Sequence, residues 1–454
     1  MAIDVGSEGV RQAGLGRVAA AAFVGTAIEY YDFFLYGMAA ALVFGREFFP
    51  VLGAASALLA ALSVYAVAFV ARPVGAVLFG HFGDRVGRKA VLVVSLLMMG
   101  LSTAAVGLLP GYAHWGIWSP VALVVLRFCQ GLGLGGEWGG AALLLAEYAP
   151  PGRRGRYAGF LQLGPSAGSV LATTVFLVLS AGLRESAFSS WGWRLPFLGS
   201  LLLVVVGLFV RLRISETPVF AVCAAEVEER PAVPVLEVLR DHWRPVLLGS
   251  GALSFGYALF YLSNTYALAY TTGELGVDRT LMLSLQLLAA PSGALAVWLS
   301  AGWSDRWGRR RTVLLGTVLA AGWSLAVFPL LESLRASLML LALLGSSALL
   351  GVLLGPMGAF LPELFPTRVR YTGAALTYNL GGVVGGATAP LLATRITETY
   401  GTATPVGWYL AVLGVASASC LCALPETCGA DLTVDRPAGA GRRGAPVVSG
   451  DPAT

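Results

Sequence analysis

Long apolar runs alternate with short polar stretches along nearly the whole chain of 454 residues. A helix needs about 20 apolar residues to cross roughly 30 Å of hydrocarbon, and most of the runs have this length. The pattern therefore predicts an all-α membrane protein with twelve transmembrane helices. Their predicted ranges are 17–45, 55–82, 90–109, 119–147, 157–181, 193–212, 246–271, 280–303, 311–331, 337–361, 371–395 and 405–424.

The predicted helices divide the chain into five parts. They are an N-terminal cytoplasmic segment (1–16), an N-terminal six-helix bundle (17–212), a cytoplasmic linker (213–245), a C-terminal six-helix bundle (246–424) and a cytoplasmic tail (425–454). The linker segment 226–245 has the pattern of a short amphipathic helix. The tail is rich in glycine, proline and alanine, which favours disorder.

Lysine and arginine are concentrated in alternate connections between the predicted helices, as the positive-inside rule describes for cytoplasmic loops. The basic residues of these loops are Arg85, Arg88, Lys89, Arg153, Arg154, Arg156, Arg211, Arg213, Arg230, Arg240, Arg244, Arg306, Arg309, Arg310, Arg311, Arg368 and Arg370. We therefore expect a multi-pass protein of the cell membrane with both termini in the cytoplasm. The first apolar run is too long for a cleavable signal peptide.

Composition narrows the class of protein further. The chain is 57% hydrophobic and 12% charged, whereas soluble domains carry about 25% charged residues. Its net charge of +5 follows from the loop asymmetry, so it does not indicate a nucleic-acid partner. Three histidines and five cysteines form no cluster with metal-ligand spacing, which argues against a metal site and a membrane metalloenzyme.

Two polar motifs occur twice, once in each bundle. GHFGDRVGRK (80–89) is repeated as AGWSDRWGRR (301–310), 221 positions later. Glu147-Tyr-Ala-Pro followed by Arg-Tyr-Ala-Gly is matched by Glu363-Leu-Phe-Pro followed by Arg-Tyr-Thr-Gly, at offsets of 216 and 214. The two bundles are therefore predicted to be parallel repeats, with a binding site at their interface near the bilayer midplane.

These motifs resemble those of the major facilitator superfamily and, more specifically, its metabolite:proton symporter family. The blocks that carry the resemblance are GTAIEYYDFFLYG (25–37), RPVGAVLFGHFGDRVGRK (72–89), RFCQGLGLGGEWGGA (127–141), WGWRLPF (191–197) and ELFPTRVRYTGAALTYNLGGVVGG (363–386). The resemblance implies proton-coupled uptake of carboxylates, shikimate, citrate, proline or betaine by a monomer. REFFP (46–50) is most similar to shikimate-type members, and Tyr30 stands where tryptophan or phenylalanine is commoner.

The repeated loop motifs combine glycines, an aspartate and an arginine cluster. The resemblance implies a gate in which Asp84 faces the start of the eleventh helix and Arg88 pairs with Glu147. A plain positive-inside turn is the alternative, and it explains the arginines but not Asp84 and Asp305. The predicted gating residues are Asp84, Arg85, Arg88, Glu147, Asp305, Arg306, Arg309, Glu363 and Arg370.

Two acidic residues, Glu29 and Asp32, lie near the middle of the first predicted helix, three positions apart and on one face. Ionisable groups at membrane depth are costly and mark function by default. A carboxyl group in such a place favours its protonated form, so the pair is predicted to load and release the driving proton. The alternative is a pair held permanently by arginines for structure.

Arg127 and Gln130, one turn apart on the fourth helix, are the predicted partner or substrate anchor, because guanidinium binds carboxylates in a two-pronged geometry. Arg72 and Arg194 lie near the ends of predicted helices, where snorkelling of the side chain to the membrane surface is a sufficient explanation. For Arg72, a functional role is the equal alternative. The role of Glu137 stays open.

The second bundle has almost no mid-membrane charge but carries polar stripes. The predicted substrate-binding residues, besides Arg127 and Gln130, are Tyr31, Gln162, Tyr257, Tyr261, Asn264, Tyr378 and Asn379. Such stripes also join helices without contacting a substrate. The sequence thus predicts proton chemistry in the first half and neutral recognition in the second.

The resulting prediction is a secondary transporter that imports a small organic acid or zwitterion with protons, needs no cofactor beyond the coupling proton, and has the substrate, protons and the lipid bilayer as partners. An exporter or uncoupled facilitator of the same fold is the alternative, and a transporter-like sensor is a remote one. Glu29 and Asp32 argue against an uncoupled path, because a passive carrier has no need of buried carboxyl groups.

Overall fold

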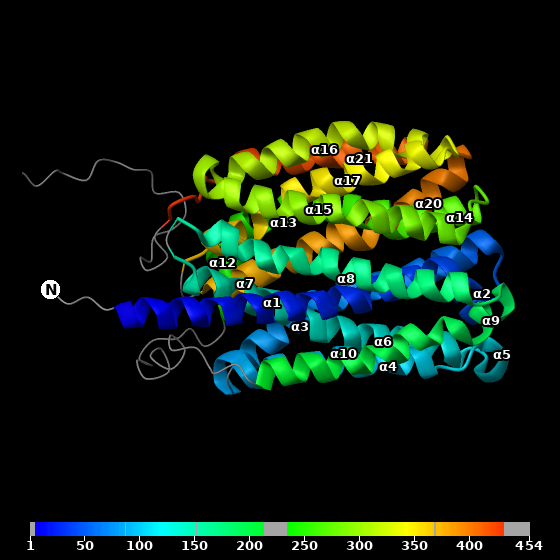
Figure 1. The fold of residues 1–454 in the computed structure, drawn as a ribbon, viewed down its shortest axis with the longest axis horizontal. Helices are drawn as coiled ribbons and strands as arrows, with labels where there is room; N and C mark the ends of the chain where they lie inside the picture. Colours follow the sequence, from blue (N-terminus) through cyan, green and yellow to red (C-terminus); the bar gives the residue numbers. More distant parts are fainter. Residues whose placement is uncertain (1–4, 87, 151, 213–233, 367–368, 431–454) are drawn as a thin grey trace, which may run out of the picture.

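The computed structural model describes residues 5–86, 88–150, 152–212, 234–366 and 369–430, without the side chains of 5–14, 17, 54–55, 80–86, 88–90, 144 and 147. Long helices run side by side along the longest axis of the molecule (Figure 1). We call the end of the bundle at which α1 begins and α21 ends the terminal end.

Within the described residues, the first half contains twelve helical elements, several of which join into one continuous helix. They are α1 Val5–Ala39, η1 Ala40–Phe44, α2 Gly45–Phe48, α3 Ala54–Val86, α4 Arg88–Leu108, α5 Tyr112–Trp115, α6 Trp118–Gly135, α7 Glu137–Tyr148, α8 Arg154–Gly182, α9 Glu185–Ala187, η2 Phe188–Gly192 and α10 Arg194–Leu212. The η elements are short stretches of π-helix, a feature frequent at functional sites.

The second half has the same kind of order. Its elements are α12 Pro234–Asp241, α13 Trp243–Tyr261, η3 Leu262–Tyr266, α14 Ala267–Gly273, α15 Arg279–Trp307, α16 Arg309–Glu332, α17 Ala336–Leu354, α18 Met357–Glu363, α19 Arg370–Gly381, η5 Gly382–Ala387, α20 Thr388–Tyr400 and α21 Thr404–Ala423. Helix α12 covers part of the predicted amphipathic segment, whose residues 226–233 lie outside the described residues.

Within the described residues, eleven helical segments are long and apolar enough to cross a membrane. The twelfth predicted span is also helical, since α19, η5 and α20 follow one another without a break from Arg370 to Tyr400. This segment is more polar than the others, because it carries charged and amide side chains such as Arg395, Glu398 and Asn379. The twelve-helix architecture predicted from the sequence is confirmed.

The structure changes two details of the sequence-based picture. Helix α1 begins at Val5, within the segment 1–16 that was predicted to precede it, because hydropathy marks where a chain leaves hydrocarbon rather than where a helix begins. Arg211, Arg309 and Arg370, which were counted among loop residues, lie inside helices and are buried.

Within each half, glycines bring two helices into close contact, and the two helix pairs occupy corresponding positions in the halves. A Cβ atom on Gly75 of α3 would lie 2.1 Å from the Leu132 carbonyl oxygen of α6. In the second half, a Cβ atom on Gly351 of α17 would lie 2.5 Å from the Gly293 carbonyl oxygen of α15. Only glycine permits these backbone approaches, so the internal repeat is present in the packing as well as in the motifs.

Candidate functional site

A small cavity lies between the two halves. Its walls come from α1, α8, α13, α17 and α19, and its lining residues are Tyr30, Gln162, Pro165, Gly256, Tyr257, Phe260, Leu354 and Tyr378. Three of the predicted substrate-binding residues, Gln162, Tyr257 and Tyr378, are therefore brought together here. The Gln162 side chain also joins the halves, because its amide donates to the Leu354 carbonyl oxygen at 2.8 Å.

Tyr30 is a lining residue that the sequence-based analysis did not select. Its hydroxyl oxygen lies 2.6 Å from that of Tyr378 in a buried hydrogen bond between the two halves. The Tyr378 ring is in turn stacked on Trp138, with ring centroids 3.8 Å apart. The departure of Tyr30 from the commoner tryptophan or phenylalanine was the available signal, because only tyrosine supplies this hydroxyl.

Three other predicted substrate-binding residues have side chains engaged elsewhere. The Tyr31 hydroxyl donates to the Pro196 carbonyl oxygen at 3.0 Å. The Asn264 amide donates to Phe260 within its own helix. The Asn379 amide donates to the Gly135 carbonyl oxygen at 3.2 Å and thereby joins α19 to α6. These contacts link or cap helix segments, and the three residues do not line the cavity.

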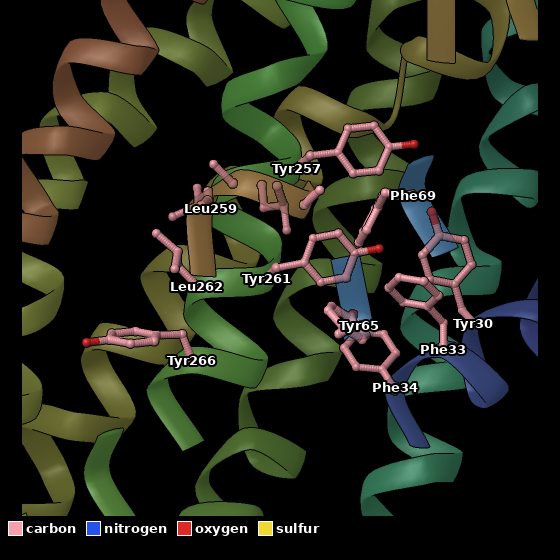
Figure 2. Packing of buried hydrophobic residues seen from close by; sticks show 14 of the residues in the cluster. Tyr30, Phe33, Phe34, Tyr65, Phe69, Tyr257, Leu259, Tyr261, Leu262 and Tyr266 are labelled. Atoms are coloured by element: carbon pink, nitrogen blue, oxygen red, sulfur yellow. The ribbon is translucent and has the colours of Figure 1, made fainter. Parts of the chain in front are cut away.

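Next to the cavity-lining Tyr30 and Tyr257, aromatic rings of both halves form a dense cluster (Figure 2). Phe33 of α1 lies 4.7 Å from Tyr65 and 5.1 Å from Phe69 of α3, measured between ring centroids. Tyr261 of α13 lies 5.2 Å from Phe33 and 5.1 Å from Phe69. The predicted substrate residue Tyr261 is thus part of this cluster, where aromatic pairs contribute about 0.5–1.5 kcal/mol each.

Asp32 and Arg127 are joined by a chain of polar side chains rather than by direct contact. Thr103 donates to Asp32 Oδ2 at 2.9 Å, Gln130 donates to the Thr103 hydroxyl at 2.8 Å, and Arg127 donates to Gln130 Oε1. The Arg127 guanidinium lies over the Tyr36 ring at 4.1 Å. Arg127 does not line the cavity, so its role as substrate anchor stays a prediction.

Glu29 and Arg72 are buried in the same region, each with 1% of its surface exposed. Arg72 lies near the middle of α3, with its guanidinium 4.5 Å from the Phe33 ring and 5.0 Å from the Phe69 ring. The snorkelling interpretation of Arg72 is therefore wrong. Arg194, by contrast, is partly exposed and pairs with Glu47 at 2.8 Å.

Glu137, whose role the sequence left open, forms an ion pair with Arg211 of α10. Arg211 also donates to the Leu92 carbonyl oxygen of α4. The backbone of α1 passes close to this pair, since a Cβ atom on Gly25 would lie 3.2 Å from Glu137 Oε1. The pair connects α7 with α10 and lies one turn from Glu29 along α1.

At the terminal end, the second loop motif forms a buried charge cluster that touches both halves. Asp305 accepts hydrogen bonds from the backbone N–H groups of Gly155 at 2.8 Å and Arg156 at 2.9 Å, at the start of α8. Arg309 lies 2.7 Å from Asp305 and 3.4 Å from Glu363. This arrangement places an aspartate at a helix N-terminus, where its charge is stabilised.

The remaining predicted gating residues divide into two groups. Arg306 is exposed beside Asp305, and the Arg370 Nε donates to the Phe365 carbonyl oxygen at 3.2 Å. The side chains of Asp84, Arg85, Arg88 and Glu147 lie outside the described residues. The first loop motif therefore stays a prediction based on its likeness to the second.

A helical membrane protein with two repeated halves around a central cavity has the architecture of a secondary transporter. The family model described as Major Facilitator Superfamily matches residues 22–390, and the chain belongs to this superfamily of transporters. Its relatives are metabolite transporters, and the chain is accordingly a multi-pass membrane transporter rather than an enzyme.

The inner membrane metabolite transport protein YhjE of Escherichia coli strain K12 is 45% identical over 402 residues, which are 87% of this chain and 91% of YhjE. The shikimate transporter of the same strain is 37% identical over 84% of this chain and 87% of its own. Among solved structures, a partially occluded inward-open conformation of the E. coli xylose transporter XylE has a TM-score of 0.75 and 18% identity, covering 92% of this chain and all of that chain. The likeness to XylE shows the fold alone.

Proposed function

We propose that this transporter imports a small organic acid or zwitterionic metabolite together with protons, by alternating access. The observation that carries the proposal is the set of buried ionisable groups beside the inter-half cavity. Glu29, Asp32, Arg72 and Arg127 are each 1% exposed or less, at a depth where such groups are costly unless they serve a function. The likeness to the shikimate transporter supports an organic acid as substrate.

The arrangement supports separate groups for the proton and for the substrate, with recognition residues from both halves. Proton loading is assigned to Glu29 and Asp32 of α1. Recognition of the neutral part of the substrate is assigned to Gln162, Tyr257 and Tyr378, with Tyr30 added from the geometry. Because the Tyr30–Tyr378 hydrogen bond joins the halves, substrate hydroxyl or amino groups that compete for it would change how the halves meet.

Gating at the terminal end is assigned to the charge cluster of Asp305, Arg309 and Glu363. Its hydrogen bonds to the start of α8 hold the two halves together at this end, and they must break when the cavity opens there. The first loop motif is assigned the same task through Asp84, Arg88 and Glu147. By the arginine bias, the terminal end faces the cytoplasm. The family resemblance supports a monomer in the inner membrane.

Export and uncoupled facilitation remain the competing functions for this fold. The buried carboxyl groups favour coupling, since a passive carrier gains nothing from the cost of burying them. A panel uptake assay separates the possibilities. Uptake into proteoliposomes with an imposed pH gradient is measured for one compound at a time. The compounds are shikimate, 2-oxoglutarate, citrate, protocatechuate, proline and betaine.

We expect at least one compound to accumulate when the interior is alkaline and to leak out again when a protonophore collapses the gradient. Liposomes without protein provide the control for passive diffusion of the acids. Equal uptake with and without the gradient would refute proton coupling. Accumulation that occurs only when the exterior is alkaline and the interior acidic would favour export. Protease accessibility must first show that the protein is not inserted in the inverted orientation.

A further inference from the structure

Two oppositely charged side chains beside the cavity lack hydrogen-bond partners. No described group accepts from Nε or Nη2 of Arg72, and none donates to Oε2 of Glu29, although these atoms are inaccessible to solvent. The two groups attract each other electrostatically, but no ion pair within 4.0 Å joins them. Buried charges are normally paired, so this arrangement leaves both groups ready for an external partner.

Arg72 does not line the cavity itself, but it lies close to residues that do. Its guanidinium interacts electrostatically with Tyr30 and Tyr257, which line the cavity from the first and second halves, and with Tyr261. Arg127 also has Nε and Nη2 atoms without a hydrogen-bond partner, but its Nη1 donates to Gln130, and the rings of Tyr36, Phe33 and Tyr65 surround it. The geometry therefore favours Arg72 over Arg127 as an anion anchor.

The other charged neighbours of Glu29 leave Arg72 as the free cation. The titratable and charged groups that act on Glu29 are Glu137, Arg72, Arg211, Tyr30, Tyr261 and Tyr378. Arg211 is already occupied by Glu137 and by the Leu92 carbonyl oxygen. Of the two arginines that act on Glu29, Arg72 is therefore the one whose Nε and Nη2 atoms have no hydrogen-bond partner among the described residues, and one guanidinium fits one carboxylate.

We infer that Arg72 binds the carboxylate of a small monocarboxylate substrate while Glu29 takes up one proton from the water on the same side. This inference rests on the proposed function and assigns its substrate class and its coupling pair. When an anion binds at Arg72, it neutralises the positive charge that stabilised the ionised Glu29. When a proton binds to Glu29, it removes the negative charge that stabilised Arg72. Each ligand therefore favours binding of the other, and the pair adds no net charge to the site.

The stoichiometry follows from charge balance. Glu29 gains a proton from bulk water as the carboxylate binds, and it returns that proton on the opposite side as the substrate leaves. One proton should accompany each monocarboxylate, and shikimate, protocatechuate or proline should bind in preference to the tricarboxylate citrate. The methyl ester of shikimate and the amide of proline should not bind, because neither offers a carboxylate to Arg72.

The test is substrate-induced proton uptake by the purified protein in weakly buffered detergent solution, followed with a pH-sensitive dye, together with radioligand binding. The probes are the six compounds of the uptake panel, with methyl shikimate and prolinamide as analogues that lack the carboxylate. Wild-type protein should take up about one proton per carboxylate bound. Glu29→Gln should still bind but take up no proton.

Arg72→Gln should weaken binding roughly 10- to 100-fold, the loss expected when a charge-assisted hydrogen bond is removed. Arg72→Lys should fall between Arg72→Gln and wild type, since lysine keeps the charge without the fork. Arg194→Gln is the matched control, because it removes a first-half arginine far from the cavity lining, and it should bind as wild type does. Arg127→Gln tests the sequence-based hypothesis and should lose less affinity than Arg72→Gln.

Wild-type affinity in monodisperse Arg72→Gln, or full proton uptake in Glu29→Gln, would overturn the inference. So would a larger loss in Arg127→Gln, or a wild-type protein that binds none of the carboxylates. The uptake assay separates this result from the proposed function. If the wild-type protein accumulates substrate and Arg72→Gln binds it normally, only the inference is removed. If the wild-type protein binds substrate and takes up a proton but does not accumulate substrate, only the proposed function is removed.

Discussion

Replacing Asp305 by asparagine should open the terminal end of the transporter. The carboxylate accepts two backbone hydrogen bonds from the first half, from Gly155 at 2.8 Å and Arg156 at 2.9 Å, and pairs with Arg309 at 2.7 Å. Asparagine keeps one acceptor oxygen and loses the charge. Charge-assisted hydrogen bonds contribute about 1.5–3 kcal/mol each, against about 1 kcal/mol for one neutral bond, so the substitution removes roughly 3 kcal/mol from the contact between the halves.

A loss of about 3 kcal/mol shifts the equilibrium between closed and open terminal ends by roughly 100-fold. Cys428 is a native reporter of this shift, because its thiol is partly buried and donates to the Asp305 carbonyl oxygen at 3.4 Å. Burial raises the pKa of the Cys428 thiol, and the neutral thiol reacts slowly with maleimides. Opening should expose the thiol, favour its ionisation and accelerate labelling.

The assay measures maleimide labelling of a variant that retains Cys428 and has the other four cysteines replaced by serine. Asp305→Asn should raise the labelling rate by at least tenfold while membrane insertion stays normal. Glu185→Gln is the matched control, because it removes the pairing with Arg279 at 3.1 Å, which belongs to the opposite end. An unchanged labelling rate in a correctly inserted Asp305→Asn protein would refute the gating role of the cluster.

Three further predictions follow from the fold and the cavity. Tyr30→Phe removes the hydroxyl bonded to Tyr378 and should weaken the contact between the halves by about 1 kcal/mol, which should change the substrate affinity severalfold. Unchanged affinity would contradict a role at the cavity. Gly75→Ala should prevent stable insertion, because its Cβ atom would lie 2.1 Å from the Leu132 carbonyl oxygen, and normal yield and melting temperature would contradict this packing. A reporter fused after residue 425 should be active only in a cytoplasmic-type assay and one near Ser186 only in an external-type assay, and an external C-terminus would overturn the orientation.

The number and approximate ends of the helices could be predicted because hydrocarbon thickness fixes the length of an apolar run. The two-half architecture could be predicted because Asp305 and Arg309 repeat, at one offset, the positions of Asp84 and Arg88. These features could be predicted because each depends on a short stretch of the sequence. The contact of Asp305 with the start of α8 corresponds to the contact that the resemblance implies between Asp84 and the eleventh helix, but it was not itself predicted.

The rotation of each helix about its axis could not be predicted, because lipid and protein interior are both apolar and leave no amphipathic signal. The sequence pattern therefore did not reveal that Tyr30 rather than Tyr31 lines the cavity. Nor did it reveal that Glu137 meets Arg211, since this ion pair joins helices that are far apart in sequence. The role of Arg72 stayed open for the same reason, because its burial at mid-helix depends on the rings that Phe33 and Phe69 bring against it.

The central claim is that carboxyl groups of α1 carry the driving proton. The most direct measurement compares two activities of Asp32→Asn and Glu29→Gln in proteoliposomes, namely accumulation driven by a pH gradient and exchange of labelled for unlabelled substrate at fixed pH. Accumulation needs a carboxyl group that alternates between charged and protonated forms, whereas exchange needs only the alternating-access motion with substrate bound. We predict that both variants lose accumulation and retain exchange. Full gradient-driven accumulation in both variants would contradict the account.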